Sequence, residues 1–499
     1  MKLADLLAGA EVLGRSGDPR ITGVEYDSRR VKPGDVFVAL KGETSDGNCF
    51  TGQAAAQGAV AVVTDSDQTP AGVAWARVRE ARRALAVVSA NFYERPAEKL
   101  AITGITGTNG KSTTAFLVES MFERAGRKSA LVGTIEYHIA DQVLPARHTT
   151  PESLDLERLL RRAVDAGARE VAMEVSSHAL AGQRTFGIPF DVAVFTNLTR
   201  DHLDYHRTME EYFAAKKKLF LGLGAPRPRR AVINADDEYG RDLIGFSRRC
   251  GSEVITYGTA KADVHPAKLE ITARGISFQM VTPGDVVPVN SQLMGRVNVH
   301  NILAAGAAAY ARGCPGEAMA AGIARLTRVP GRFERVDCGQ PFTVVVDYAH
   351  TDDALRNLTS LAREFVKSSG GRVITLFGCG GDRDRAKRPL MGEAVGRGSD
   401  FVVLTSDNPR SEDPLAIIND AAVGLQRTGT KYAVEADRGP AIRLAVERAR
   451  RGDIVLVAGK GHEKEQILVS GPVPFNDVQV AAEVLGALGY DCSKQGAGA

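Results

Sequence analysis

Residues 101–122 read AITGITGTNGKSTTAFLVESMF, and this stretch decides the fold. An apolar strand leads into Gly104, a glycine-rich loop continues to Lys111, and a helix is predicted from Ser112 onward. Backbone N–H groups at the positive end of a helix dipole can cradle phosphates, while Lys111 would add a point charge and Ser112 a hydroxyl ligand for Mg²⁺. Ile105 stands where the strict pattern GxxxxGK[ST] has its first glycine. The order of strand, loop and helix still favours a phosphate-binding loop over a glycine-rich turn with an incidental lysine.

Short apolar strands alternate with helical stretches around this loop. We expect strands at residues 100–105, 130–132, 170–173, 192–196 and 231–233. Such alternation is typical of a mostly parallel sheet with helices on both faces. Later in the same region, LEITARGISFQMV predicts a hairpin, and NILAAGAAAYARG predicts an alanine-rich helix.

The first hundred residues predict a smaller α/β domain. The opening MKLADLLAGAEVLGRSGD reads as an amphipathic helix rather than a signal peptide, because Asp5 and Glu11 interrupt its short apolar segment. Further on, AAAQGAVAVVTD reads as a helix, a glycine and a strand.

Four apolar strands are expected beyond residue 330, at 343–346, 373–377, 402–405 and 454–457. Each is followed directly by a polar cluster, and the four clusters read DYAHT, GCGGDRD, SDNPR and AGKGHE. Open α/β sheets bind ligands at the carboxyl ends of their strands, so these clusters predict a substrate or nucleotide site.

The sequence therefore predicts an α/β protein of three domains. These are a small N-terminal α/β domain, a central P-loop domain with a mostly parallel sheet and a C-terminal Rossmann-like domain. The predicted limits are 1–97, 98–329 and 330–490, with a disordered tail at 491–499.

Composition excludes several classes of function. The 499 residues carry a formal charge of only +3, which gives no electrostatic case for nucleic acid or an anionic membrane. No apolar run is long enough to span a bilayer. The six cysteines are far apart and form no CxxC motif, so we expect neither a zinc cluster nor a disulfide framework. This cysteine usage fits a protein of the reducing cytoplasm.

Three polar features of the central region are candidates for chemistry, each beside a simpler interpretation. Glu174 ends a buried strand, where it could ligate Mg²⁺ with Ser112 or be capped or salt-bridged. Asp201 and His202 follow another strand in a cluster that, alone, is often only a polar loop. The run Lys216 to Lys218 favours a solvated helix face, although spacing lets Lys216 share a face with two aromatic residues.

Nine motifs together resemble the Mur ligase family in identity and order. They are TGTNGKST, MEVSSHAL, TNLTRDHLDYH, HNILAA, GRFE, DYAHTDDAL, FGCGGDRDRAKRP, SDNPR and AGKGHE, and the resemblance as a whole extends from YDSR near residue 28 to GKGHE near 463. The resemblance implies an ATP-dependent amide ligase that activates a carboxylate as an acyl phosphate, with ATP as co-substrate and two Mg²⁺ ions. It implies a UDP-sugar in the N-terminal domain, ATP in the central domain and an amino acid in the C-terminal domain.

The resemblance is closest to family members that add meso-2,6-diaminopimelate to UDP-MurNAc-L-Ala-D-Glu in peptidoglycan precursor synthesis, as cytoplasmic monomers. The motif matches imply a catalytic group of Lys111, Glu174, His202 and Lys216. The implied metal ligands are Ser112, Glu174, His202 and Lys216, the last as a carbamate (N6-carboxylysine). The implied nucleotide contacts are Gly107, Thr108, Asn109, Gly110, Lys111, Ser112, Thr113, Asn301, Arg332 and Asp347, supported by His350.

For the UDP-sugar dipeptide, the matches imply contacts from Ser28, Thr149, Thr150, Ser176 and Arg184. The sequence departs from the family pattern at Gly182, where glutamine is usual and where Gln183 follows, and at His148, where asparagine is frequent. For diaminopimelate, the matches imply Arg383, Asp407, Asn408, Pro409, Arg410, Gly459 and Glu463.

DNPR discriminates between amino acids, because a guanidinium can bind the second carboxylate that diaminopimelate has and lysine lacks. The alternatives are a lysine-adding or more permissive ligase, a folylpolyglutamate synthase-like enzyme, and a P-loop ATPase or binding protein without ligase activity.

Overall fold

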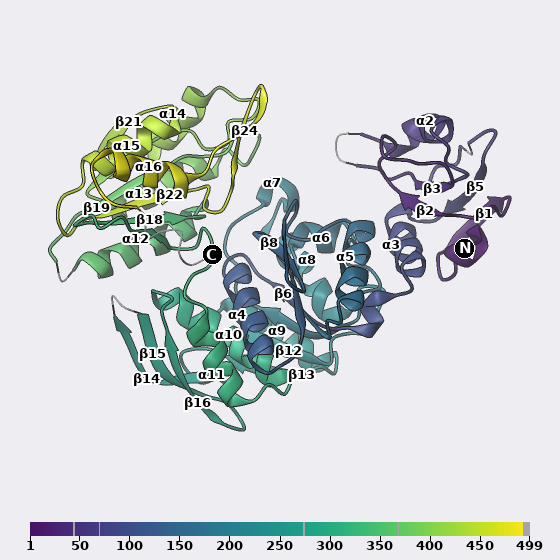
Figure 1. Ribbon diagram of the computed structural model, residues 1–499, viewed down its shortest axis with the longest axis horizontal. Helices are drawn as coiled ribbons and strands as arrows, with labels where there is room; N and C mark the ends of the chain where they lie inside the picture. The colour runs from purple at the N-terminus through teal and green to yellow at the C-terminus, as the bar shows by residue number, and fades with distance from the viewer. Residues whose placement is uncertain (43–44, 69, 273–274, 368, 493–499) are drawn as a thin grey trace.

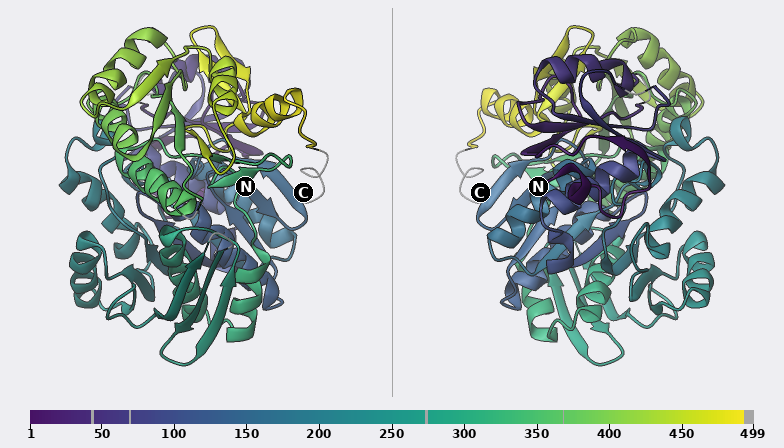
Figure 2. Two further views of the ribbon diagram at one scale, coloured as in Figure 1. Left: turned by 90° about the vertical axis from the view of Figure 1, so that its left-hand side faces the viewer. Right: turned by 90° about the vertical axis from the view of Figure 1, so that its right-hand side faces the viewer.

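The computed structural model describes residues 1–42, 45–68, 70–272, 275–367 and 369–492. They form three α/β lobes in chain order, which confirms the predicted fold class. The two outer lobes lie on the same side of the central lobe, and a small three-stranded sheet lies at its opposite end (Figures 1 and 2).

The N-terminal lobe is a five-stranded sheet in the order β1-β5-β4-β3-β2, in which β1 is antiparallel to β5 and the other neighbours are parallel. The predicted helix over residues 1–18 is wrong beyond Leu6. Gly9 adopts a φ of 87°, which ends the helical turn, and Val12–Ser16 pairs with β5 as a strand. The lobe contains α1 (Leu3–Leu6), β1 (Val12–Ser16), β2 (Gly23–Glu25), β3 (Asp35–Val38), η1 (Gly47–Phe50), α2 (Thr51–Ala56), β4 (Ala61–Thr64), β5 (Ala74–Val78) and α3 (Ala81–Phe92).

The central lobe has an eight-stranded sheet in the order β13-β12-β11-β6-β10-β7-β8-β9. The first six strands are parallel, and β8 and β9 add an antiparallel edge. The lobe contains η2 (Pro96–Lys99), β6 (Ala101–Thr106), α4 (Lys111–Arg124), β7 (Ser129–Val132), β8 (Glu136–Ile139), β9 (Gln142–Pro145), α5 (Ser153–Asp165), β10 (Glu170–Glu174), α6 (Ser177–Ala181), β11 (Phe190–Phe195), α7 (Leu203–His206), α8 (Met209–Leu221), β12 (Arg230–Asn234), α9 (Glu238–Arg249), β13 (Glu253–Tyr257), β14 (His265–Thr272), β15 (Gly275–Val281), β16 (Val286–Ser291), α10 (Arg296–Ala311) and α11 (Gly316–Arg325).

All five strands predicted around the phosphate loop are present, as β6, β7, β10, β11 and β12. The predicted hairpin is present as β14 and β15, with residues 273–274 outside the described part, and β16 extends it to three antiparallel strands. The edge strands β8, β9 and β13 were not predicted, because short edge strands carry little apolar periodicity.

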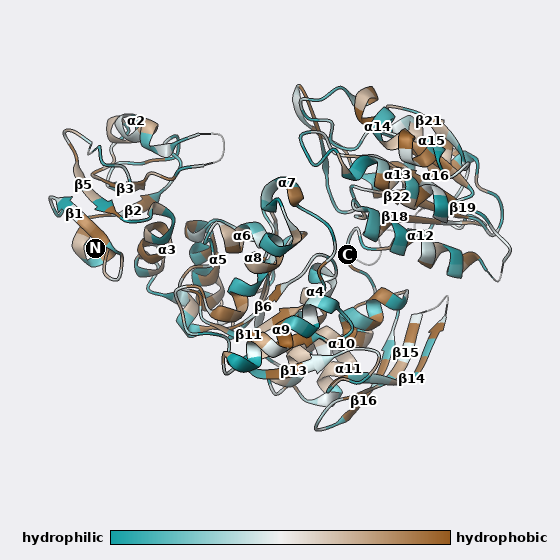
Figure 3. Cartoon of the chain, turned by 180° about the vertical axis from the view of Figure 1, so that it is seen from behind, coloured by the Kyte–Doolittle hydropathy of each residue, from teal (hydrophilic) through white to brown (hydrophobic). Residues whose placement is uncertain are grey.

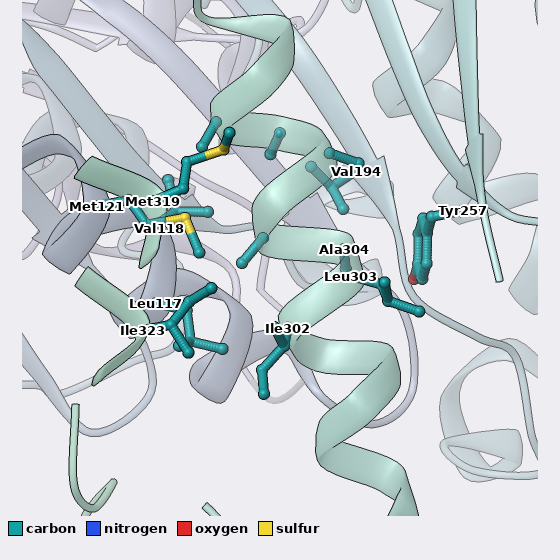
Figure 4. Close-up of a cluster of buried hydrophobic side chains, with 14 of the residues drawn as sticks. Leu117, Val118, Met121, Val194, Tyr257, Ile302, Leu303, Ala304, Met319 and Ile323 are labelled. Atoms are coloured by element: carbon teal, nitrogen blue, oxygen red, sulfur yellow. The ribbon is translucent and has the colours of Figure 1, made fainter. Parts of the chain in front are cut away.

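The central sheet is buried on both faces, and alternate residues of one strand serve two cores. In β11, Val192 and Val194 belong to one cluster, while Ala193 and Phe195 belong to the other. Helix α10 packs against the first face, where Leu303 lies near Tyr257, while Ile302 lies on the side of Leu117 and Ile323 (Figure 4). The small residues of α10 permit close approach, because a Cβ at Gly306 would collide with Met280. Apolar residues accordingly concentrate on the inner sides of helices and strands (Figure 3).

The C-terminal lobe has a six-stranded sheet in the order β17-β18-β22-β19-β20-β21, parallel except for β17. The four predicted strands are β18, β19, β20 and β22. The lobe contains β17 (Glu334–Val336), β18 (Thr343–Asp347), α12 (Asp352–Val366), β19 (Val373–Phe377), α13 (Lys387–Gly398), β20 (Phe401–Leu404), α14 (Pro414–Gln426), β21 (Lys431–Val434), α15 (Arg438–Glu447), β22 (Ile454–Ala458), β23 (Glu465–Leu468), β24 (Gly471–Pro474) and α16 (Asp477–Ala487).

The cysteine prediction is partly wrong, because Cys338 and Cys492 form a disulfide with Cα atoms 4.2 Å apart. The two residues are 154 positions apart and meet only because the chain after α16 returns beside the end of β17. No spacing motif reveals a pair created by tertiary packing. Most of the predicted tail, residues 493–499, lies outside the described part of the chain. Among the described helices, none has the length and apolar character needed to cross a membrane.

Candidate functional site

The phosphate loop has the backbone that its glycines predict. Strand β6 lies between β10 and β11 and ends at Thr106, and α4 begins at Lys111. Gly107 and Gly110 adopt φ values of 152° and 86°, and a Cβ on either would collide with Thr196 or Asn301 respectively. The loop therefore requires glycine at both positions, and the N-terminus of a 14-residue helix faces it.

Lys111 folds back over this loop. Its Nζ donates hydrogen bonds to the carbonyl oxygens of Gly107 at 3.0 Å and Thr108 at 2.9 Å. Burial lowers the pKa of Lys111, as does the neighbouring Arg332, while Glu174 opposes the shift. Lys111 is thus held at the phosphate loop by neutral hydrogen-bond acceptors, which an anionic ligand can replace.

A cavity of about 490 Å³ lies over the phosphate loop and is lined by both the central and C-terminal lobes. It brings together most of the residues expected at the nucleotide and metal sites: Thr108, Asn109, Gly110, Lys111, Ser112, Thr113, Glu174, His202, Asn301, Arg332, Asp347 and His350, with Thr149 and Ser176. The lining does not include Gly107, Ser28, Thr150, Arg184, Lys216, Arg383, Asp407, Asn408, Pro409, Arg410, Gly459 or Glu463.

Residues of the C-terminal lobe line this cavity together with the phosphate loop. Arg332 Nη2 donates to the Ser112 hydroxyl at 3.3 Å, and the Arg332 guanidinium lies 4.6 Å from the Tyr348 ring centroid. The Asp347 carboxylate accepts hydrogen bonds from Phe333 N and Ala349 N, which ties the segment before β17 to the carboxyl end of β18. Asn109 reaches the same lobe through a 3.2 Å hydrogen bond to Asp353.

Glu174 is fully buried at the end of β10 and has a neutral partner. Its two carboxylate oxygens accept hydrogen bonds from Thr134 N at 2.8 Å and Thr134 Oγ1 at 2.9 Å. Thr134 Oγ1 also lies 3.0 Å from Thr149 Oγ1, so a chain of polar atoms links Glu174 to the next loop. The buried carboxylate is therefore satisfied by hydrogen bonds from a single neutral residue. Sequence reasoning missed Thr134, which belongs to no motif.

Lys216 is buried to 1% exposure, so the solvated-face interpretation is wrong for this residue. Helix α8 turns Tyr212, Lys216 and Phe220 to one buried face, as their spacing predicts. Lys216 Nζ donates to the Gly107 carbonyl oxygen at 2.8 Å and lies 4.5 Å from the Tyr212 ring centroid. Burial and the nearby Lys111 lower the pKa of Lys216 well below its usual value. The amine is therefore poised to lose its proton beneath the phosphate loop.

Asp201 links the central lobe to the C-terminal lobe. Its carboxylate lies 3.4 Å from His202 Nε2, 4.0 Å from His350 Nε2 and 3.9 Å from Lys387 Nζ. Although burial opposes it, the attraction of these groups lowers the pKa of Asp201 to about 2. Burial lowers the pKa of His202, which keeps its imidazole neutral and able to ligate a cation. Lys387 was missed as a partner, although it follows the GCGGDRD cluster closely.

The residues expected to contact the UDP-sugar dipeptide lie on two lobes. Thr150 Oγ1 donates to the Glu174 carbonyl oxygen and accepts from Ser176 N, and Arg184 Nη1 donates to the Thr150 carbonyl oxygen at 3.2 Å. Ser28, on the N-terminal lobe, instead bonds to Gln53 at 3.1 Å. Three of these residues therefore form one connected group, and Ser28 approaches from a separate lobe.

Of the two departures from the family pattern, Gln183 acts through its side chain, whereas His148 contacts Tyr137 only through its backbone. Gln183 accepts a hydrogen bond from Arg83 Nε at 2.6 Å and donates to Glu80 Oε2 at 2.8 Å, so it joins the loop after α6 to α3 of the N-terminal lobe. The His148 carbonyl oxygen accepts from the Tyr137 hydroxyl at 2.6 Å.

Two guanidiniums are neighbours here, Arg410 of the SDNPR loop and Arg383 of the GCGGDRD loop. Arg410 adopts a φ of 54° and donates from Nη1 to the Gly381 carbonyl oxygen at 2.7 Å. Burial and the positive charge of Arg383 lower the pKa of Arg410. Arg383 Nη1 bonds to the Asp382 carbonyl oxygen at 2.9 Å, again a neutral acceptor. Two mutually repelling cations held by carbonyl groups would attract a carboxylate ligand.

A phosphate loop under a cavity that a second α/β lobe completes, with a third lobe beside it, defines a multidomain P-loop protein. Three family profiles match consecutive parts of the chain: "Mur ligase family, catalytic domain" over residues 20–95, "Mur ligase middle domain" over 105–309 and "Mur ligase, glutamate ligase domain" over 331–461. The chain belongs to the Mur ligase family.

Relatives with a shared name extend over almost the whole chain. A UDP-N-acetylmuramoyl-L-alanyl-D-glutamate–2,6-diaminopimelate ligase of Solibacter usitatus is 54% identical over 472 residues, which are 94% of either chain. A ligase of the same name from Geobacillus thermodenitrificans is 46% identical over 94% of this chain and 95% of its own.

Two solved structures give the same architecture. A structure of a ligase with that name is 33% identical, with a TM-score of 0.65 over 94% of this chain and 95% of the other. MurF ligase of Thermotoga maritima in complex with ADP is 18% identical, with a TM-score of 0.64 over 95% and 99%, and shows the shared fold.

Proposed function

We propose that this protein is an ATP-dependent ligase that adds meso-2,6-diaminopimelate to UDP-MurNAc-L-Ala-D-Glu in peptidoglycan precursor synthesis. One observation carries the proposal: similarity of 54% identity extends through all three lobes to a relative with that named activity. Because the reaction consumes ATP and a UDP-linked precursor, we place it in the cytoplasm. Residues 1–97 would hold the UDP-sugar, 98–329 the ATP and 330–490 the amino acid.

The proposed chemistry has two steps. An oxygen of the D-Glu carboxylate attacks the γ-phosphorus of ATP, the bond to ADP breaks, and an acyl phosphate forms. The diaminopimelate amine then attacks the acyl carbon, and inorganic phosphate leaves as the nitrogen loses a proton. Phosphoryl transfer depends mainly on positioning and charge neutralisation, which Lys111 and the helix N-terminus of α4 are placed to provide.

The cavity has donors that fit Mg²⁺ only in part. Among the described residues, no three His, Cys, Asp or Glu side chains converge as a ready-made metal site. Ser112, Glu174 and His202 offer a hydroxyl, a buried carboxylate and a neutral imidazole around one cavity, and nucleotide phosphates would complete the ligand set. Bound there, Mg²⁺ would neutralise charge on the transferring phosphoryl group.

We propose that Lys216 is carbamylated. A neutral amine reacts with CO₂, and the lowered pKa of Lys216 makes its amine neutral more readily than that of an exposed lysine. A bond forms between the nitrogen and the carbon of CO₂, one proton is released, and the product, N6-carboxylysine, has an anionic oxygen that would be a ligand for a second Mg²⁺. The same modification removes the repulsion that a second ammonium would exert on Lys111 and on the metal.

The assignment of the amino acid rests on Arg410 and Arg383. Their guanidiniums would bind the carboxylate at the far end of diaminopimelate, while Asp407 and Glu463 would attract an ammonium group. Asn408, Pro409 and Gly459 shape the same pocket. Thr149, Thr150, Ser176, Arg184 and Ser28 would hold the UDP-sugar dipeptide, and Asn301, Arg332, Asp347 and residues 107–113 the nucleotide.

The direct test supplies the protein with Mg-ATP, UDP-MurNAc-L-Ala-D-Glu and either meso-diaminopimelate or L-lysine, and measures phosphate release and product mass. We expect phosphate and a tripeptide product with diaminopimelate. Product with lysine instead would leave a ligase of different specificity, and phosphate release that ignores the UDP-sugar would favour an ATPase.

A further inference from the structure

Lys460 is a buried lysine in the AGKGHE loop that follows β22. Its side chain has 0% exposure, and its Nζ donates to Asn408 Oδ1 at 2.9 Å and Glu463 Oε2 at 2.8 Å. Asp407 Oδ1 lies 3.7 Å from the same nitrogen. The Lys460 ammonium thus lies close to three residues of the proposed diaminopimelate site.

We propose that Lys460 is a positioning residue for the amino-acid substrate, acting through Asn408 and Glu463. This inference rests on the proposed assignment of that pocket to diaminopimelate. Lys460 fixes which end of the Asn408 amide faces inward, because a lysine donates only to the oxygen. Asn408 Oδ1 also accepts from Ile467 N at 2.9 Å, and its Nδ2 donates to Glu463 Oε2 at 2.9 Å.

The network leaves defined groups for a ligand. Within the described part of the chain, both side-chain hydrogen bonds of Glu463 fall on Oε2, which leaves Oε1 to a ligand in a side chain that is 30% exposed. Asp407 Oδ1 is buried and has no hydrogen-bond partner among the described residues. A buried carboxylate oxygen without a donor indicates a site that a donor ligand completes.

The charges of the cluster favour an ammonium ligand. Asp407 and Glu463 carry two negative charges, and Lys460 carries one positive charge. The nearby Arg438 is neutralised by Asp477 through a fully buried ion pair at 2.7 Å. The formal charges of Asp407, Glu463 and Lys460 therefore sum to about −1. This negative charge lies beside the two guanidiniums that would bind the far carboxylate of diaminopimelate. The Lys460 ammonium lies near both the Asp407 and the Glu463 carboxylates and so offsets the repulsion between them.

The test compares steady-state kinetics of Lys460→Met, an apolar side chain of similar length, with Lys464→Met, a change at an exposed lysine of the same segment. For Lys460→Met we expect the KM for meso-diaminopimelate to rise about 10- to 100-fold, with KM for ATP and for the UDP-sugar dipeptide within about twofold. Lys464→Met should leave all three values unchanged. Equal loss for every substrate, or an unchanged KM for diaminopimelate, would overturn the proposal.

A double-variant cycle tests whether Lys460 acts through Glu463. We expect Lys460→Met combined with Glu463→Gln to lose no more than the larger single effect, because both changes break one network. Independent, multiplying losses would overturn the proposal. If Lys460→Met fails to fold, Lys460→Gln, which retains one donor group, takes its place in both experiments. A normal diaminopimelate KM in Glu463→Gln alone would instead show that the pocket assignment is wrong, and the positioning role with it.

Discussion

Two loops of this chain combine glycine and lysine directly after a central parallel strand, and they use the lysine in opposite ways. After β6, TGTNGKS leads into a helix, and Lys111 is half-buried with only carbonyl oxygens as hydrogen-bond acceptors. After β22, AGKGHE leads into a hairpin, and Lys460 is fully buried against a carboxylate and an amide. Lys111, which is bonded to neutral acceptors, can bind an anionic ligand. Lys460, which is bonded to a carboxylate, instead fixes the positions of the side chains around it.

The largest effect should come from breaking the first loop. Lys111→Met removes the point charge over the phosphates, and we expect kcat/KM to fall by about 1,000-fold or more. Phosphate release with all three substrates measures it. Lys128→Met, at an exposed lysine beyond α4, is the matched control. Activity within tenfold of the unaltered protein would remove Lys111 from the chemistry.

Lys216 extends the comparison, because it is as buried as Lys460 but donates a hydrogen bond to a carbonyl oxygen rather than to a carboxylate. We expect Lys216→Ala to lose activity by about 100-fold or more, and a small added carboxylic acid to restore part of it by replacing the carbamate. Phosphate release with and without acetate measures the rescue. Full activity without any acid would mean that the carbamate does not form or does not matter.

Arg410→Ala probes the SDNPR loop, which the hydrogen bond from Lys460 to Asn408 joins to the second loop. We expect a loss of transition-state stabilisation for diaminopimelate on the order of 2–4 kcal/mol, because the far carboxylate is left unpaired. The ratio of kcat/KM between variant and unaltered protein gives this value. Arg385→Ala, an exposed arginine paired with Glu412 and Asp420, is the control. An unchanged ratio for Arg410→Ala would contradict the assignment of DNPR.

The smallest expected effect is on the stability of the central lobe, where His138 contacts the helix that follows the first loop. His138 Nδ1 contacts Glu119 of α4 at 2.7 Å, and its Nε2 contacts Glu136 at 2.9 Å. Although burial opposes it, these carboxylates raise the pKa of His138 from 6.5 to about 10. Because the folded pKa is raised, the stabilisation is complete below pH 6.5 and disappears as the pH rises through about 10.

His138→Gln should therefore lower the melting temperature by about 3 °C at pH 6, and the difference should shrink toward pH 10. Thermal unfolding of both proteins across this range measures it. A constant difference would mean that His138 stabilises the lobe by packing rather than by charge.

The phosphate loop could be predicted because its function depends on local backbone: glycines at fixed positions, a strand before them and a helix after. The strands that end at DYAHT, GCGGDRD, SDNPR and AGKGHE could be predicted for the same reason. Thr134, Gln183, Lys387 and Lys460 could not be assigned, because each acts through a partner that only tertiary packing brings near. The disulfide between Cys338 and Cys492 escaped prediction on the same ground.

If the two loops serve opposite ends of one reaction, paired binding measurements on two variants will separate their ligands. Calorimetric titration of ADP, and of meso-diaminopimelate in the presence of the UDP-sugar dipeptide, would be made on Lys111→Met and Lys460→Met. We predict a crossed result, in which Lys111→Met weakens only ADP and Lys460→Met weakens only diaminopimelate. Loss of the same ligand in both variants, or of both ligands in each, would contradict the account.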